Sequence, residues 1–515
     1  MTRKIRLLPA FLTVGVWTLA SRILGFVRDI LLAALLGAGP VAEAFFVAFS
    51  LPNLFRRFFA EGAFNLAFVP LFSKKLEAGQ GAEEFARDAL SGLIAILIAL
   101  TLIAQLFMPW LVLAMAAGFA EDQRLPLAIE YGRIAFPYIL FISIAALFSG
   151  ALNAMGRFAA AAAAPVLLNL CLIGAMVGAA VLALPIGPAL IWAVPLAGVL
   201  QAVLVWQAAE RAGLRLRPRL PRMTPALRRL AIIAAPAALP GGVVQINLLV
   251  GRQVASFFDG AIVWLSLADR LYQLPLGLVG IAIGIVLLPD LSRRLQAGDT
   301  AGGAQQINRA LEFALLLTLP ATVALIVIAT PLVSVLFGRG AFGAGDVAAT
   351  ALAVAVYGAG LPAFVLQKVY APVFFAREDT KTPFRYALAA MVVNAALAIG
   401  LSPFLGYLAA ALGTTVSAWA MLYLLIRGAA RIEGAVVRDP ALERRLWRIA
   451  AASLLMGAAL SLAAAPLAPA LAEPGWRYLA LAGLVGGGAA VYASAALALR
   501  AVDLASLRRA LRRGA

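Results

Sequence analysis

The chain has 515 residues, of which 63% are hydrophobic and only 13% are charged, and its formal net charge is +18. Soluble domains carry about 25% charged residues, so this composition excludes an ordinary soluble protein. The chain contains no histidine, which excludes histidine-based metal sites, Ser-His triads and histidine proton relays.

Apolar segments long enough to cross a bilayer, about 20 residues each, recur along almost the whole chain. We therefore predict an all-α polytopic membrane protein with fourteen transmembrane helices. The N-terminal stretch has the basic and apolar regions of a signal peptide. Its apolar pattern continues past Arg22 to Leu36, however, so we interpret it as the first membrane helix. The expected segments are 9–37, 41–72, 88–117, 125–152, 159–183, 188–209, 229–257, 261–291, 306–330, 345–375, 384–403, 406–426, 449–470 and 477–499.

The distribution of Lys and Arg among the connections predicts the orientation of the chain. An even number of crossings places both termini on one side, and that side holds 31 of the 42 basic residues. The connections on the other side hold three, Arg124, Arg339 and Arg477. Because cytoplasmic loops are enriched in Lys and Arg, we expect both termini in the cytoplasm. The basic charge then reflects topology and attraction to anionic membrane lipids, and no nucleic-acid partner is expected.

Similar residues about 225 positions apart indicate an internal repeat. Pro137 and Pro362 are 225 residues apart, as are Asn169 and Asn394, and three further pairs lie 219 to 224 apart. We predict two pseudo-symmetric six-helix lobes of the same orientation, a plan in which transporters place their site between the halves. The predicted parts are the first lobe (1–211), the second lobe (212–430) and a final helix pair with a cytoplasmic tail (431–515).

Several charged residues lie inside the expected membrane segments. A charge at the bilayer centre costs about 3 kcal/mol, so these side chains are expected to face a protein interior or a water-filled cavity. The alternatives for each are snorkelling and a structural ion pair. The candidate substrate-binding residues are Arg22, Arg28, Asp29, Arg56, Arg57 and Arg270. The candidate gate or supporting residues are Glu43, Glu61, Asp269 and Lys368, of which Glu61 and Lys368 form a hypothetical salt-bridge gate.

The excess of arginine over acid in these segments favours an anionic substrate, because the guanidinium fork matches phosphate. A drug antiporter for cations would be expected to have a carboxylate-rich cavity instead. The sequence has no Walker-type loop, no paired-acid metal motif and no extramembrane domain large enough for a nucleotide fold. We therefore predict a secondary transporter, not an enzyme, driven by an ion gradient, the membrane potential or substrate flux.

Six stretches carry a resemblance to a known family: "SRILGFVRDILLAALLGAG", "EAFFVAFSLPNLFRRFFAEGAFNLAFVPLF", "FPYIL", "LNAMGRF", "LADRLYQLPLGLVGIAIGIVLLPDLS" and "REDTKTP". They resemble the MurJ (MviN-type) family of lipid II flippases, within the multidrug/oligosaccharidyl-lipid/polysaccharide exporter superfamily. The resemblance covers essentially the whole chain. It implies fourteen helices, with a lipid-facing groove formed by the last pair. It also implies that undecaprenyl-pyrophosphate-linked peptidoglycan precursor moves by alternating access from the inner to the outer leaflet of the bacterial cytoplasmic membrane.

The resemblance also implies roles for single residues. The cavity arginines of the family match Arg22, Arg28, Arg56 and Arg270, and the acid early in the second helix, an aspartate in other members, is Glu43. Some members bind sodium, and the corresponding candidates are Asn247, Asn394 and Thr414. Ala398 stands where such members have a further acid.

The resemblance implies lipid II, membrane lipids and the cell-wall synthesis machinery as partners. No cofactor is expected beyond a monovalent cation such as sodium, and coupling to the membrane potential is the alternative. Three other functions stay open. They are a flippase for another polyprenyl-linked oligosaccharide, a non-transporting membrane scaffold for cell-wall enzymes, and a drug exporter.

Overall fold

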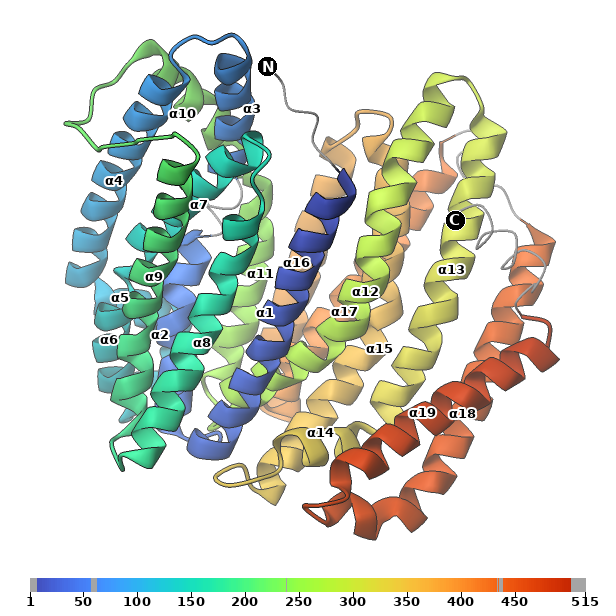
Figure 1. The fold of residues 1–515 in the computed structure, drawn as a ribbon. Helices are drawn as coiled ribbons and strands as arrows, with labels where there is room; N and C mark the ends of the chain where they lie inside the picture. Colours follow the sequence, from blue (N-terminus) through green and yellow to red (C-terminus); the bar gives the residue numbers. More distant parts are fainter. Residues whose placement is uncertain (1–6, 57–62, 238, 433, 435–438, 502–515) are drawn as a thin grey trace. The chain divides into compact units, whose positions relative to one another are not determined.

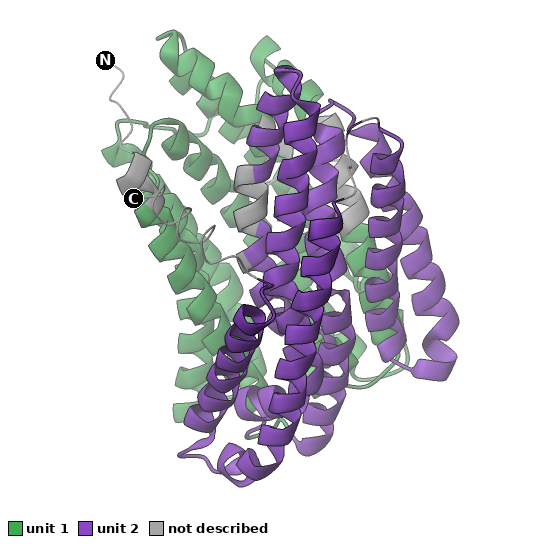
Figure 2. Cartoon of the chain, turned by 90° about the vertical axis from the view of Figure 1, so that its right-hand side faces the viewer, with its two compact units in different colours: residues 1–263, 340–342 green, residues 264–339, 343–515 purple. Residues whose placement is uncertain are grey.

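The computed structural model describes residues 7–56, 63–237, 239–432, 434 and 439–501, and these form helices joined by short connections (Figure 1). No strand occurs among the described residues, so the predicted all-α class is confirmed. The chain packs as two compact units, residues 1–263 with 340–342 and residues 264–339 with 343–515 (Figure 2). These units are defined by packing, whereas the lobe boundaries given above come from the sequence repeat and stay a prediction.

The first unit contains eleven α-helices and one short 3-10 helix among its described residues. They are α1 (Leu7–Leu36), α2 (Pro40–Arg56), α3 (Ala63–Glu77), α4 (Ala82–Leu106), α5 (Met108–Met115), η2 (Ala117–Phe119), α6 (Arg124–Ala135), α7 (Tyr138–Ala154), α8 (Ala159–Val181), α9 (Ile186–Arg211), α10 (Pro225–Ala237) and α11 (Leu239–Ala255).

The second unit contains the remaining helices, and the first turn of α12 belongs to the first unit. They are α12 (Ala261–Gln296), α13 (Thr300–Val327), α14 (Ala329–Phe337), α15 (Ala344–Phe375), α16 (Lys381–Leu405), α17 (Leu408–Ala430), α18 (Pro440–Ala472) and α19 (Arg477–Ala498).

Two of the expected segments are broken by proline. The segment 88–117 divides into α4 and α5 at Phe107, two residues before Pro109, and the segment 125–152 divides into α6 and α7 at Phe136 and Pro137. Proline has no backbone N–H to donate, so the hydrogen bonding of the helix is interrupted near these positions.

Ten helical stretches of the described residues are long and apolar enough to cross a membrane. They correspond to ten of the fourteen expected segments, and the multi-pass membrane architecture follows from them. The other four segments, 9–37, 41–72, 229–257 and 261–291, are also largely helical where they are described. The full count of fourteen crossings stays a prediction.

The two units share a packing pattern. In the first unit α9 packs against α7 and α8, and in the second unit α17 packs against α15 and α16. These helix triplets occupy corresponding places in the repeat predicted from residue pairs about 225 positions apart. The final pair, α18 and α19, runs side by side and packs against α14, while α18 also packs against α13 (Figure 1).

Candidate functional site

Arg28 lies in a buried polar cluster on α1. Its Nε and Nη2 atoms donate to Oδ1 of Asp29 over 3.0 and 2.7 Å, and its Nη1 atom donates to Oδ1 of Asn169 on α8 over 3.0 Å. Arg28 is 8% exposed and Asp29 is 2% exposed. The Asn169 amide donates in turn to the backbone oxygen of Ser21 over 3.0 Å. The guanidinium is therefore charge-compensated and held in one orientation by two helices.

The other arginines of the first unit differ in their surroundings. Arg22 is exposed on α1 and forms no hydrogen bond or ion pair with the described part of the chain. Arg56 is half-buried near the end of α2, and its Nε atom donates to Oδ1 of Asn53 over 3.2 Å. Arg57 and Glu61 lie outside the described residues. Arg22 and Arg28 thus lie on one helix. Arg22 is exposed, whereas the charge of Arg28 is compensated by Asp29.

The remaining charged candidates belong to the second unit. Asp269 and the exposed Arg270 lie on α12, where Asp269 accepts a hydrogen bond from the amide of Gln273. The Lys368 side chain on α15 lies against Gly280 of α12, and a Cβ at Gly280 would be 2.5 Å from Nζ of Lys368. The convergence of these residues with Arg28 on one cavity stays a prediction, as does the pairing of Lys368 with Glu61.

The sodium candidates also divide between the units. Asn394 on α16 is fully buried beside α17, and the hydroxyl of Thr414 on α17 donates to the backbone oxygen of Ala410 over 3.0 Å. Asn247 lies on α11 of the first unit. Asn394 and Thr414 supply oxygen atoms from adjacent helices, but the described residues bring together no group of three acidic or thiol side chains for a metal ion.

A second charged cluster joins α2 to α6 through the buried side chains of Glu43 and Arg124. Nη1 of Arg124 lies 2.9 Å from Oε2 of Glu43, and the two side chains are 6% and 1% exposed. The other carboxylate oxygen, Oε1, accepts a hydrogen bond from the backbone N–H of Ile262 over 3.2 Å. Arg124 also pairs with Asp122, and with Asp259 over 3.1 Å. We call these four charged residues the Glu43–Arg124 cluster.

Two hydrogen bonds of the residues before Arg124 connect segments that are far apart in sequence. The N–H of Gly118 donates to Oγ of Ser256 over 2.9 Å, and the N–H of Ala117 donates to Oε1 of Gln253 over 3.1 Å. These contacts fix the connection after α5 against the C-terminal end of α11. Segments from both predicted repeats therefore meet at this end of the first unit.

Residues 340–342 also pack in the first unit, although they lie far from it in sequence. The N–H of Ala341 donates to the backbone oxygen of Ala34 near the end of α1 over 2.8 Å. Gly340 has a positive φ of 57°, and a Cβ there would collide with the same Ala34 oxygen. Only glycine combines this backbone conformation with so close an approach.

Asp122 lies in the connection before α6, outside the expected membrane segments. The hydrogen bond from the Arg124 side chain is the main cause that lowers the pKa of the Asp122 carboxyl below its ordinary value of 3.8. Asp122 is therefore ionised at neutral pH and stabilises the positive charge of Arg124.

Four residues of these clusters were not among the candidates selected from the sequence: Asn169, Arg124, Asp122 and Asp259. Asn169 served only as evidence for the repeat, and its contact with Arg28 spans 141 positions. Arg124 was counted as a loop charge. Its position gave one usable signal, since it is one of only three basic residues in connections that are otherwise free of Lys and Arg.

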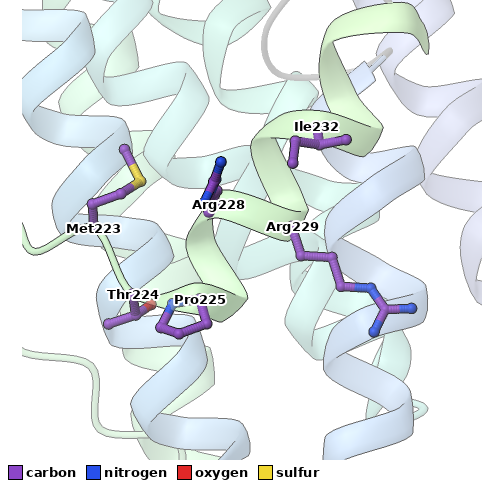
Figure 3. A pocket seen from close by; sticks show the side chains of 6 residues that line it. All are labelled: Met223, Thr224, Pro225, Arg228, Arg229 and Ile232. Carbon is purple, nitrogen blue, oxygen red and sulfur yellow. The ribbon is translucent and has the colours of Figure 1, made fainter.

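The basic linker between α9 and α10 is attached to α4. Arg219 donates through Nε to Oδ1 of the buried Asp88 over 2.6 Å, and its backbone N–H donates to Oγ of Ser91 over 2.9 Å. A pocket of about 420 Å³ lies at the start of α10 (Figure 3). Figure 3 shows the side chains of Arg228 and Arg229 extending in different directions, so they do not converge on a ligand there.

Comparison with known protein families finds a match over most of the chain. The profile of the family described as lipid II flippase MurJ matches residues 32–484. The chain is 44% identical over 526 residues to a probable lipid II flippase MurJ of Rhizobium meliloti (strain 1021), covering 99% of this chain and 97% of that protein. It is 37% identical over 459 residues to the lipid II flippase MurJ of Burkholderia cenocepacia, covering 87% and 89% of the two chains.

Solved structures give the same result. A lipid II flippase MurJ in an inward closed conformation superposes with a TM-score of 0.79 at 25% identity, covering 95% of this chain and 98% of that chain. An inward-facing multidrug resistance transporter of the MATE family superposes with a TM-score of 0.66 at 16% identity, covering 82% and 96%. The second match shows a shared fold only.

Proposed function

Because the chain belongs to the lipid II flippase MurJ family, we propose that it moves lipid II from the inner to the outer leaflet of the bacterial cytoplasmic membrane. The substrate would be a polyprenyl pyrophosphate that carries the peptidoglycan precursor. The proposal requires no covalent chemistry, because the lipid is the same molecule before and after the step. The cell-wall synthesis machinery would consume the lipid at the outer leaflet.

The observation that carries the proposal is the buried guanidinium of Arg28 together with the open guanidinium of Arg22 on the same helix. Six residues of an α-helix rise about 9 Å and turn the second side chain about 120° from the first, so the two guanidinium groups reach one diphosphate when their long side chains bend toward the same side. Two guanidinium groups at this spacing provide charge-assisted hydrogen bonds for two phosphate groups.

The ion pair between Arg28 and Asp29 explains how this site is stable without substrate. An isolated buried charge costs several kcal/mol, whereas a charge that is paired and hydrogen-bonded is tolerated. We infer that a substrate phosphate competes with Asp29 for Arg28 and that Asn169 keeps the guanidinium in place during the exchange. Arg22 has no acid partner among the described residues and would supply the net positive charge.

The Glu43–Arg124 cluster supports a role in alternating access. By the positive-inside rule it lies at the outer end of the helices, and it connects the predicted first repeat to residues 253–263 of the second. We infer that these contacts close the outer end and separate when the cavity opens outward. An interior-negative potential would favour outward movement of an anionic headgroup, by about 2.3 kcal/mol per charge per 100 mV.

The experiment that tests the proposal is depletion of the protein in a bacterium, followed by a leaflet-resolved assay of lipid II. Rescue is compared for the wild type, Arg28→Ala and Arg133→Ala. Arg133 is a matched control, because it is an exposed arginine at the end of α6. We expect lipid II to accumulate on the cytoplasmic side after depletion, and we expect rescue by wild type and Arg133→Ala only.

Three other outcomes would contradict parts of the proposal. If lipid II still reaches the outer leaflet after depletion, the substrate is wrong and another polyprenyl-linked glycan becomes the leading alternative. If Arg28→Ala rescues fully while present at wild-type levels in the membrane, the substrate assignment stands and the inferred capture by Arg28 is wrong. If substitutions of Arg22, Arg28 and Arg270 together leave growth normal, a scaffold role replaces transport.

A further inference from the structure

A second cationic cluster lies in the second unit, at the junction of α14 and α19. Nη1 of Arg339 donates to the hydroxyl of Tyr478 over 2.5 Å. The guanidinium carbons of Arg339 and Arg477 lie 5.6 and 5.1 Å from the centroid of the Tyr478 ring. Two arginines that are 138 positions apart in the sequence are thus held against one aromatic ring.

No acid compensates these two arginines within the part of the chain that the structure describes. Neither guanidinium forms an ion pair there, although Glu473 lies only four residues before Arg477 in the connection between α18 and α19. Arg339 also donates to the backbone oxygens of Val335 and Leu336, where a cation stabilises the C-terminal end of α14. Arg477 is the first residue of α19, and the helix dipole does not favour a cation at an N-terminal end. Two uncompensated like charges on one ring repel each other, and a bound anion would remove this repulsion.

The surroundings of the cluster are typical of a membrane–water interface. Trp476, Tyr478 and Leu479 are 60%, 46% and 66% exposed at the start of α19. Exposed aromatic residues beside apolar ones are enriched at the level of lipid headgroups. Arg339 and Arg477 are also two of the three basic residues on the side that the positive-inside rule places outside. An anion at this level of an outer leaflet is most commonly a lipid phosphate.

We propose that Arg339, Arg477 and Tyr478 form a binding site for the phosphate group of a lipid in the outer leaflet. The Tyr478 hydroxyl accepts a hydrogen bond from Arg339, so its own proton is available to a phosphate oxygen. The two guanidinium groups supply further charge-assisted donors. The outer location rests on the topology of the proposed function. The chemistry fits two sources, the phosphate of an ordinary anionic phospholipid and the pyrophosphate of a polyprenyl lipid that has been moved outward.

Lipid binding to the purified full-length protein tests the proposal. Native mass spectrometry in detergent micelles would measure the apparent Kd for phosphatidylglycerol and, separately, for undecaprenyl pyrophosphate. The variants are Arg477→Gln, Arg339→Gln and Tyr478→Phe, and the matched control is Arg444→Gln, an exposed arginine on α18 of the same unit. Arg477→Gln is expected to raise the apparent Kd about tenfold, because one charge-assisted contact is lost. Tyr478→Phe keeps the ring and is expected to weaken binding severalfold.

Comparison of the two lipids shows which of them supplies the bound phosphate group. Weaker binding of both lipids supports a general phosphate site, and weaker binding of one lipid alone identifies that lipid as the ligand. The proposal is overturned if Arg477→Gln binds both lipids like the wild type, or if Arg444→Gln weakens binding equally. Arg477→Lys retains the charge and should retain part of the affinity, which separates loss of the site from misfolding.

A labelling experiment separates this proposal from the proposed function. In a Cys171→Ala background, Trp476→Cys should react with a membrane-impermeant maleimide added to intact spheroplasts. Absence of labelling would overturn the outer location and, with it, the topology assumed for transport. Normal labelling together with unchanged lipid binding would overturn the phosphate site alone.

Discussion

Glu43 accepts hydrogen bonds from two directions, since one carboxylate oxygen binds Nη1 of Arg124 over 2.9 Å and the other binds the backbone N–H of Ile262 over 3.2 Å. The carboxylate therefore holds α6 and the start of α12 to α2. Because Glu43 is 1% exposed, its charge is tolerated only while Arg124 compensates it. The reverse is not true, since Arg124 also contacts Asp122 and Asp259.

This asymmetry predicts that Arg124→Gln is more destabilising than Glu43→Gln. Loss of Arg124 leaves a buried carboxylate without its cation and is expected to lower the free energy of unfolding by about 3–5 kcal/mol. Loss of the Glu43 charge leaves Arg124 paired with the more exposed acids and should cost less. Denaturant unfolding of the two single variants and the double variant in micelles would measure both effects. Additive single effects would contradict direct coupling of the two side chains.

The low pKa of Asp122 predicts a loss of stability in acid. The carboxyl titrates below its ordinary value of 3.8 in the folded protein, so the folded state binds fewer protons than the unfolded state near this pH. The stabilisation is therefore present above about pH 4 and is lost as the pH falls through the folded-state pKa. Melting temperatures of wild type and Asp122→Asn between pH 7 and pH 3 test this. The difference between the two proteins should shrink toward pH 3, and a constant difference would be evidence against the ion pair.

The close approach of Gly340 to α1 predicts that Gly340→Ala is destabilising. A Cβ at this position would collide with the backbone oxygen of Ala34, and the positive φ adds strain for any L side chain. We expect a loss of about 1–3 kcal/mol in the free energy of unfolding. Gly174→Ala on α8 is the matched control, because a Cβ there has open space and alanine favours a helix. Equal melting temperatures of the two variants would show that the 338–343 connection can move away from α1.

The contact between Arg219 and Asp88 predicts that the basic linker is protected from proteolysis. Arg219→Gln removes the ion pair with Asp88, while Arg217→Gln removes an exposed arginine with no ion pair to the described residues. We expect a chymotrypsin-type protease to cut the 212–224 linker severalfold faster in Arg219→Gln than in Arg217→Gln or wild type. Cleavage at the same rate in all three proteins would show that Arg219 does not hold the linker.

The orientation of Arg28 by Asn169 predicts graded effects on growth. Asn169→Ala keeps the Arg28 charge and its contact with Asp29 but removes the contact with α8, so partial rescue of a depleted strain is expected. Arg28→Lys keeps the charge and loses the planar fork, so weak rescue is expected. Levels of both variants in the membrane need to match wild type. Full rescue by Arg28→Lys would mean that only the charge at this position matters.

Much of the fold could be predicted from local pattern. Apolar segments of bilayer length identified the helices, and Pro109 and Pro137 account for two of the breaks within them. The candidate residues Arg28 and Glu43 could be selected because a charge in an apolar segment needs a compensating partner. Their partners could not be selected in this way. Asn169 is 141 positions from Arg28 and Arg124 is 81 positions from Glu43, and no local periodicity connects them.

The sequence by itself determined that the chain is a helical membrane protein with an excess of arginine over acid in its apolar segments, because hydropathy and charge act on each segment separately. The tertiary structure decided which charges compensate one another. It paired Arg28 with Asp29 and Asn169, paired Glu43 with Arg124, and brought Arg339 and Arg477 to Tyr478 without an acid among the described residues. Charge compensation depends on distances of about 3–4 Å between side chains, and packing of helices sets those distances.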